Sequence, residues 1–176
     1  MTMAPRPRKI VLTAHVASTV GRLGAVVVFL ALSVVGLISQ DAQMVRAAYL
    51  VMEPAAWMVL VPLAFASLLT GIVQALGTPW GPFRHYWVLF KLLITVVATI
   101  VLLTYMETFG LIAGIAAETT FSNGDLGELR SPSPMIHAAL ALLALLLATV
   151  LSVYKPRGMT RHGWRKQNEQ HVVSQR

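Results

Sequence analysis

The chain alternates between four long apolar segments and short stretches that contain charge, proline or glycine. The apolar segments cover about residues 16–38, 55–76, 86–107 and 135–154. Each has about 20 residues, which as a helix crosses a hydrocarbon core of roughly 30 Å. The strands of a membrane barrel would be about half as long. The pattern therefore predicts an all-α protein, a polytopic membrane four-helix bundle.

Basic tails flank this predicted transmembrane domain of residues 16–154. They cover residues 1–15 and 155–176, and we expect residues 1–9 to be disordered and the C-terminal tail to be flexible. A basic leader before an apolar run also occurs in cleaved signal peptides. This run is longer than an ordinary signal-peptide core and lacks a small-x-small site, which predicts an uncleaved signal anchor.

Two details of the middle segments bear on helix boundaries. Pro54 precedes the second segment and is expected in its first helical turn, whereas Pro62 lies within the segment and predicts a kink. After Glu107 the apolar character resumes as far as Ala117. Either the third helix continues past the membrane or a short second helix lies on the outer surface.

Composition agrees with a membrane protein. The chain has 176 residues, of which 56% are hydrophobic and 12% charged, whereas soluble domains carry about a quarter charged residues. There is no cysteine, which excludes disulfides and thiolate metal sites. The net charge of +7 comes mainly from the tails and one short loop. We therefore expect the lipid bilayer as the partner of these charges, and no nucleic acid.

Lysine and arginine in short segments predict the orientation of the bundle, because they favour the cytoplasmic side. Arg46 and Arg130 lie on one side together with most of the acidic residues. The other side holds the two tails and the second loop, so both termini are expected in the cytoplasm (N-in/C-in) at the cell membrane. Its basic residues are Arg6, Arg8, Lys9, Arg84, Lys155, Arg157, Arg161, Arg165, Lys166 and Arg176.

Ionisable residues within apolar segments are costly, and a first set lies in the predicted cytoplasmic half. His15 and Arg22 are seven residues apart and share one face of the first helix, and Lys91, about five residues into the third, can reach a similar depth. With Arg84 and His85 they form a candidate site for an anionic ligand, such as a lipid phosphate or a haem propionate. The alternative is that Arg22 and Lys91 snorkel to the headgroups, which we favour for Lys91 because one and a half turns are within reach of a lysine stem. For Arg22 the purely apolar run after Leu23 also favours snorkelling. If the core instead begins at Ile10, Arg22 lies near the midplane and must be paired or hydrated.

A second set lies near the outer helix ends and contains Glu53, Glu107 and His137. His137 could ligate a metal, with Glu53 or Glu107 orienting it. Their spacing is not diagnostic of a metal centre, and a partly hydrated interfacial histidine explains His137 more simply. We therefore predict no metal site. No nucleophile elbow, phosphate loop or paired-carboxylate pattern argues for an enzyme.

Four stretches resemble a family of actinobacterial integral membrane proteins that has no established activity. They are residues 15–24 (HVASTVGRLG), 67–81 (SLLTGIVQALGTPWG), 84–93 (RHYWVLFKLL) and 154–160 (YKPRGMT). The likeness covers most of the chain. It implies a four-helix membrane protein.

A second resemblance is to HemJ-type protoporphyrinogen oxidases and to the membrane domain of copper-resistance-D-like proteins. It rests on the first-helix His15, on the bulky residue and glycine that follow, and on Lys91 early in the third helix. In the HemJ-type family these two positions are linked to haem and activity, which the resemblance would carry over to His15 and Lys91. The sequence departs from that pattern at Arg22, where those proteins usually have tryptophan.

Three functional interpretations follow. The first is an accessory or structural membrane protein whose buried charges serve topology and packing. The second is a haem-binding or redox protein that uses His15 with Lys91 or Arg22. The third is a small transporter or ion-handling protein in which Arg22, Lys91, Glu107 and His137 line a path.

Overall fold

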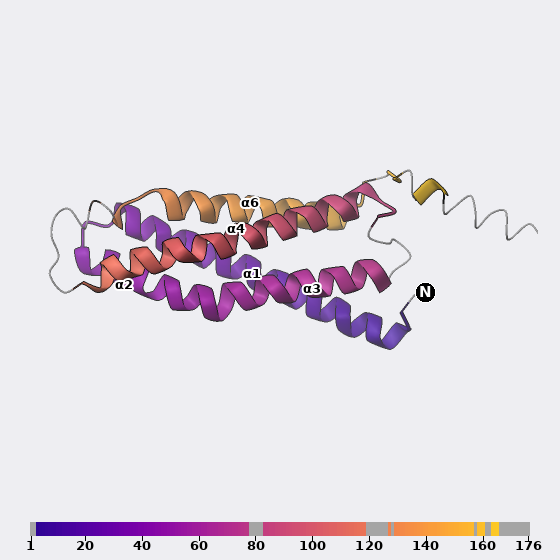
Figure 1. Cartoon of the computed structure of the whole chain (residues 1–176), viewed down its shortest axis with the longest axis horizontal. Coiled ribbons are helices and arrows are strands. Elements are labelled where there is room, and N and C mark those ends of the chain that lie inside the picture. Colours follow the sequence, from indigo (N-terminus) through magenta and orange to yellow (C-terminus); the bar gives the residue numbers. More distant parts are fainter. Residues whose placement is uncertain are drawn as a thin grey trace, which may run out of the picture.

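Long helices running side by side make up almost all of the computed structural model, which describes residues 3–77, 83–118, 127, 129–156, 158–160 and 163–165. Figure 1 shows them as one elongated bundle. In chain order they are α1 (Pro5–Ile38), α2 (Ala42–Ala55), the π-helical turn η1 (Ala56–Leu60), α3 (Val61–Gly77), α4 (Tyr86–Ala117) and α6 (Ser133–Tyr154).

The prediction of a four-helix bundle is confirmed. Within the described ranges, four helices are long and apolar enough to span a membrane: Pro5–Ile38, Ala42–Gly77, Tyr86–Ala117 and Ser133–Tyr154. The last, at 22 residues, is ~33 Å long and matches the hydrocarbon core, because a helix rises about 1.5 Å per residue. The other three have 32 to 36 residues and extend beyond such a core.

The first helix begins earlier than predicted. Residues 5–9 were expected to be disordered, but α1 starts at Pro5. Pro5 and Pro7 fit the first turn of a helix, because the amide groups there have no partner within the helix. The backbone N–H of Met3 also donates to the carbonyl of Gly77, 3.1 Å away, which ties the start of the chain to the end of α3.

The second span also begins earlier, at Ala42 rather than near Ala55. Asp41 caps it, since its Oδ1 accepts from the amide of Gln43 at 2.9 Å. Pro54 therefore lies inside a helix and not in its first turn, so that prediction is wrong. The turn η1 lies directly before Pro62. A proline ring clashes with the carbonyl four residues earlier, and the wider π turn makes room for it.

The two remaining boundary questions have clear answers. α4 continues without a break to Ala117, so the apolar residues after Glu107 extend the third helix and do not form a separate surface helix. The C-terminal tail is docked where it begins, because Met159 forms an antiparallel bridge with His85 and the amide of Thr160 donates to the carbonyl of Arg84 at 3.0 Å. The expectation of a flexible tail is therefore wrong for residues 158–160, while residues 166–176 lie outside the described part.

Helix α1 packs against α2, α3 and α6, and α4 packs against the same three helices. One end of the bundle holds the start of α1, the start of α4 and the end of α6, and we call it the tail end (Figure 1). The opposite end, where α1 turns into α2, is the loop end. An apolar core lies toward the loop end, where Phe29 meets Phe109 edge-on with ring centroids 5.7 Å apart.

A close approach of α1 and α2 secures the loop end of the bundle. Tyr49 of α2 is 1% exposed, and its ring lies against Gly36 of α1. A Cβ atom at Gly36 would come within 2.6 Å of the tyrosine ring. The short connection between the two helices leaves little freedom to relieve such a contact. Glycine is therefore required at this position for steric reasons.

We predict that Gly36→Ala lowers the stability of the bundle by about 1–3 kcal/mol, as overpacking of a filled core does. The matched control is Gly24→Ala in the same helix, where an added Cβ meets nothing within 4 Å. Alanine there should raise stability by up to about 1 kcal/mol through its helix propensity. Thermal unfolding of the two purified variants in one detergent measures both. Equal midpoints would contradict the packing of Tyr49 on Gly36.

Candidate functional site

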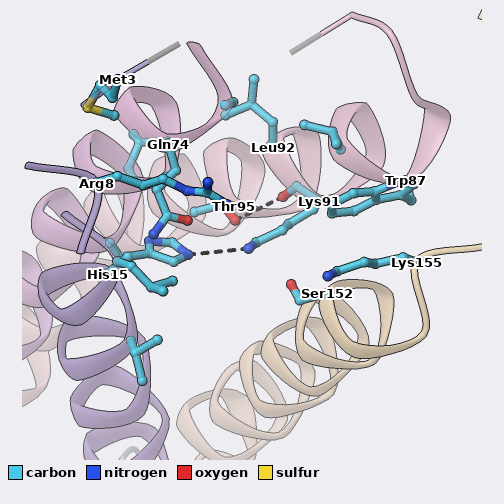
Figure 2. Close-up of a pocket in the computed structure, with 17 residues that line it drawn as sticks. Met3, Arg8, His15, Gln74, Trp87, Lys91, Leu92, Thr95, Ser152 and Lys155 are labelled. Atoms are coloured by element: carbon cyan, nitrogen blue, oxygen red, sulfur yellow. Dashed lines mark hydrogen bonds between the residues drawn. The ribbon is translucent and has the colours of Figure 1, made fainter. Parts of the chain in front are cut away.

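Two residues singled out by sequence meet at the tail end of the bundle. The Nζ atom of Lys91 in α4 lies 3.3 Å from Nε2 of His15 in α1, and Figure 2 shows the contact as a dashed line. His15 is only 8% exposed and belongs to the buried face of α1. The prediction that Lys91 reaches the depth of His15 is confirmed. The side chain of Lys91 extends to His15, which favours a role in the predicted inner site over simple extension of the side chain to the headgroups.

The hydrogen bonds around His15 determine where its ring proton lies. The hydroxyl of Thr70 donates to the carbonyl of Ala66 at 2.5 Å, so its oxygen accepts from Nδ1 of His15 at 3.0 Å. The ammonium group of Lys91 has only donors. Nε2 of His15 is therefore the acceptor, and the imidazole is neutral with its proton on Nδ1.

Helix α3 can hold the ring in this way because Gly71 faces it. A Cβ at Gly71 would lie 3.1 Å from Cε1 of His15, tighter than ordinary van der Waals contact. The absence of a side chain at Gly71 lets α3 approach the imidazole and present the Thr70 hydroxyl to it. Three helices thus fix one histidine: α1 carries it, α3 orients it and α4 donates to it.

His15 and Lys91 line a cavity of about 380 Å³, which we call the basic pocket. Arg8 and Lys155 also line it, and Figure 2 shows them on opposite sides of the His15–Lys91 contact. Among the described lining residues there is no carboxylate. Nε2 of Gln74, another lining residue, is buried without a hydrogen-bond partner in the described part of the chain.

The walls of the basic pocket combine this charge with apolar surface. Leu12, Trp87 and Leu92 contribute the apolar part, and Ser67, Thr95 and Ser152 add hydroxyl groups. Cationic groups at one end of a membrane helix bundle with apolar walls suit an anionic headgroup attached to an apolar body. The arrangement can bind and orient such a molecule.

Arg22 does not belong to the basic pocket. It shares the buried face of α1 with His15, as predicted, but seven residues along a helix amount to about 10 Å. Arg22 is 3% exposed and lines a separate cavity near the middle of the bundle. The expectation that it snorkels to the headgroups is therefore wrong, because its side chain is enclosed by neighbouring helices.

Two other residues of the predicted inner set also lie apart. Arg84 and His85 precede α4, where their backbone binds the C-terminal tail at Met159 and Thr160. Neither is among the residues that line the basic pocket.

The outer set does not come together as a metal site. Nδ1 of His137 donates to the carbonyl of Ser133 at 2.9 Å, and the ring stacks on Tyr105 with centroids 4.0 Å apart. The groups that orient His137 are therefore Ser133 and Tyr105. Glu107 is exposed and the carboxylate of Glu53 lies beside Gly110. Over the described ranges no group of three or more histidine, aspartate or glutamate side chains is placed to hold a metal ion.

The residues that we expected to line a transport path do not line one common cavity. Lys91 lines the basic pocket, Arg22 and His137 line the second cavity, and Glu107 lines neither. The two cavities share no described lining residue.

Several residues of the basic pocket were missed by sequence reasoning. Arg8 and Lys155 were assigned to unstructured tails, and Thr70 and Gln74 are ordinary polar residues in an apolar span. One signal was present: Arg8, His15 and Arg22 recur every seven residues, which places them on one face of a helix that starts before Arg8. No comparable signal marked Thr70, because its role depends on the close approach of α3 to α1.

Comparison of the chain with protein-family models, with curated proteins and with solved structures found no match. The resemblances described from the sequence therefore stay predictions. Any function proposed for the chain therefore rests on the geometry of the site alone.

Proposed function

We propose that this protein is an accessory membrane protein that binds a phosphate-bearing amphiphile in the basic pocket. The observation that supports the proposal is the convergence of Arg8, Lys91 and Lys155 on one cavity whose described lining contains no carboxylate. Arg8 and Lys155 are exposed and Lys91 is partly buried, so positive charge collects at the cavity and favours a ligand of opposite charge there. A phosphate headgroup offers up to two negative charges and several acceptor oxygens.

The shape of the site favours an amphiphile over a free anion. Apolar residues of α1 and α4 line the same cavity as the cations, so a ligand that fills it buries a hydrocarbon part beside its headgroup. The unpartnered amide of Gln74 supplies a further neutral donor. His15 is held as an acceptor, so its contribution is to keep the ammonium group of Lys91 in place at 3.3 Å.

We further propose that the tail end of the bundle faces the cytoplasm at the cell membrane, as the distribution of lysine and arginine predicts. The absence of native cysteine makes a direct test possible. In intact cells, a membrane-impermeant maleimide should label Gln40→Cys at the loop end. Lys9→Cys should react only after the cells are permeabilised. The reverse labelling would contradict this orientation.

The binding proposal predicts that dodecyl phosphate stabilises the purified full-length protein in a non-ionic detergent. Lys91→Gln should weaken that binding at least about tenfold, which corresponds to one charge-assisted hydrogen bond. Lys9→Gln is the matched control, because Lys9 is exposed near the same end of α1 and does not line the pocket. Titration calorimetry gives the affinities, and inorganic phosphate serves as the headgroup without a chain.

Equal affinity of the wild type and of Lys91→Gln for dodecyl phosphate would overturn the binding proposal. If inorganic phosphate binds as tightly as dodecyl phosphate, the ligand is a free anion rather than an amphiphile, which also contradicts it. We expect the wild type to bind dodecyl phosphate tightly and inorganic phosphate much more weakly. Of the two variants, only Lys91→Gln should lose affinity for dodecyl phosphate.

Haem is the second candidate, and the donor set of the pocket supports it. Nε2 of His15 carries the lone pair that an axial ligand needs, and Arg8, Lys91 and Lys155 are suited to the propionates. Haem would supply electron-transfer chemistry when bound. Lys91 would have to release Nε2, because the ammonium group now donates to it.

If haem binds, protein expressed with ample haem supply should show a Soret band after purification in mild detergent. His15→Ala should abolish the band. Thr104→Val is the control, since the hydroxyl of Thr104 donates to the carbonyl of Val101 in the same helix and Thr104 does not line the pocket. A colourless wild-type preparation would contradict the haem candidate without affecting the phosphate proposal.

A further inference from the structure

A second cavity of about 510 Å³ lies between α1, α4 and α6, and we call it the Arg22 cavity. Its polar side chains are few. Besides Arg22 they include His137 and Tyr105, while the rest of the described lining is apolar and contains Phe29, Leu60 and Leu102. It shares no described lining residue with the basic pocket, so a ligand bound here occupies a site of its own.

The guanidinium group of Arg22 is buried in this cavity, and no described residue that lines the cavity is a counter-ion for it. The residue is 3% exposed, and its Nη1 atom has no hydrogen-bond partner among the described residues. Arginine keeps its charge under all ordinary conditions. An unpaired charge in an apolar interior costs several kcal/mol, so a membrane protein that keeps one has a partner or a function for it.

The other polar groups of the cavity are engaged elsewhere and are not anions. His137 donates to the carbonyl of Ser133 and stacks on Tyr105. The hydroxyl of Tyr105 is hydrogen-bonded to the hydroxyl of Ser133, 2.9 Å away. No described residue that lines the cavity carries a carboxylate. The partner of Arg22 must therefore come from outside the described chain.

The cavity also has a rim that faces outward. Leu93 and Val97 of α4 and Leu140 of α6 line it, and they are 55%, 49% and 59% exposed. These side chains lie on helices that are long and apolar enough to span a membrane. A ligand that reaches the Arg22 cavity past this rim passes over apolar surface, which an apolar molecule does at little cost and a free hydrated anion does not.

We infer that the Arg22 cavity binds a long-chain apolar molecule with a single carboxylate, of the fatty-acid class. The planar guanidinium group matches a carboxylate in a bidentate pair. The apolar lining accommodates the chain, and the outward rim between α4 and α6 admits it from the bilayer. A single cation in the cavity fits one negative charge, whereas the several cations of the basic pocket fit a phosphate.

The test uses the purified full-length protein and palmitate labelled with ¹³C at its carboxyl carbon. Wild-type protein should give a carboxyl resonance distinct from that of palmitate in micelles, and it should bind palmitate at least about tenfold more tightly than methyl palmitate, which has no charge. Arg22→Gln should lose the resonance and the preference. Lys91→Gln, in the basic pocket, should retain both.

Two further measurements separate loss of the site from loss of the fold. A cooperative thermal unfolding transition of Arg22→Gln, compared with that of the wild type in the same detergent, reports whether the bundle is intact. Ala141→Phe keeps Arg22 but fills part of the cavity, since Ala141 lines it, and this variant should also lose palmitate binding.

Equal binding of palmitate and methyl palmitate would overturn the inference, and so would wild-type palmitate binding by Arg22→Gln. Loss of the resonance in Lys91→Gln but not in Arg22→Gln would assign palmitate to the basic pocket and would also overturn it. Failure of dodecyl phosphate to bind the wild type bears only on the basic pocket. The two proposals can therefore fail separately.

Discussion

Cationic side chains inside an apolar helix bundle need negative charge nearby, and the described interior of this protein provides none at the two cavities. Arg8, Lys91 and Lys155 converge on the basic pocket, and Arg22 is enclosed in the middle of the bundle. In water such charges would be solvated at no cost. Arg8 and Lys155 are exposed at the basic pocket and Lys91 is partly buried, whereas the enclosed charge of Arg22 is expensive in a membrane bundle unless it is paired. We propose that an anion from outside the described chain resolves this constraint at both cavities.

Helix α1 organises the arrangement. Its buried face runs from His15 through Arg22 and Phe29 to Gly36 at intervals of seven residues, so one face contributes to both cavities, to the aromatic core and to the contact with Tyr49. The tail end of this face is polar and faces α3 and α4. The loop end is apolar and tightly packed. The tightest packing therefore lies at the loop end, while the contact of His15 with Lys91 lies at the tail end.

The sequence predicted the helical bundle and its number of spans because each span is a long apolar run with polar ends. It also predicted that His15 and Lys91 reach the same depth, since that depends only on position along two helices. The helix starts at Pro5 and Ala42 were missed, because apolar runs mark the hydrocarbon core and not the helix that extends beyond it. Basic residues near Pro5 and the residues after Asp41 continue the helices beyond the apolar runs.

The details of the site depend on contacts between helices, which no local pattern reveals. Thr70 determines the tautomer of His15 only because Gly71 lets α3 approach, and Lys155 lines the pocket at the end of α6, which packs against α1 and α4. The position of Arg22 also depended on contacts between helices that the local sequence does not reveal. The apolar run after it favoured a position near the headgroups, whereas the packing of α1 against three other helices encloses it.

The central claim is that anions from outside the described chain balance the cations at the two cavities. Mass spectrometry of the lipids and fatty acids that remain bound after purification in mild detergent tests it most directly, with the wild type compared with Lys91→Gln and Arg22→Gln. The account predicts near-stoichiometric anionic amphiphiles on the wild type, with a phosphate-bearing species lost from the first variant and a carboxylate-bearing species lost from the second. Identical extracts from all three proteins, in the proportions of the bulk membrane, would contradict it.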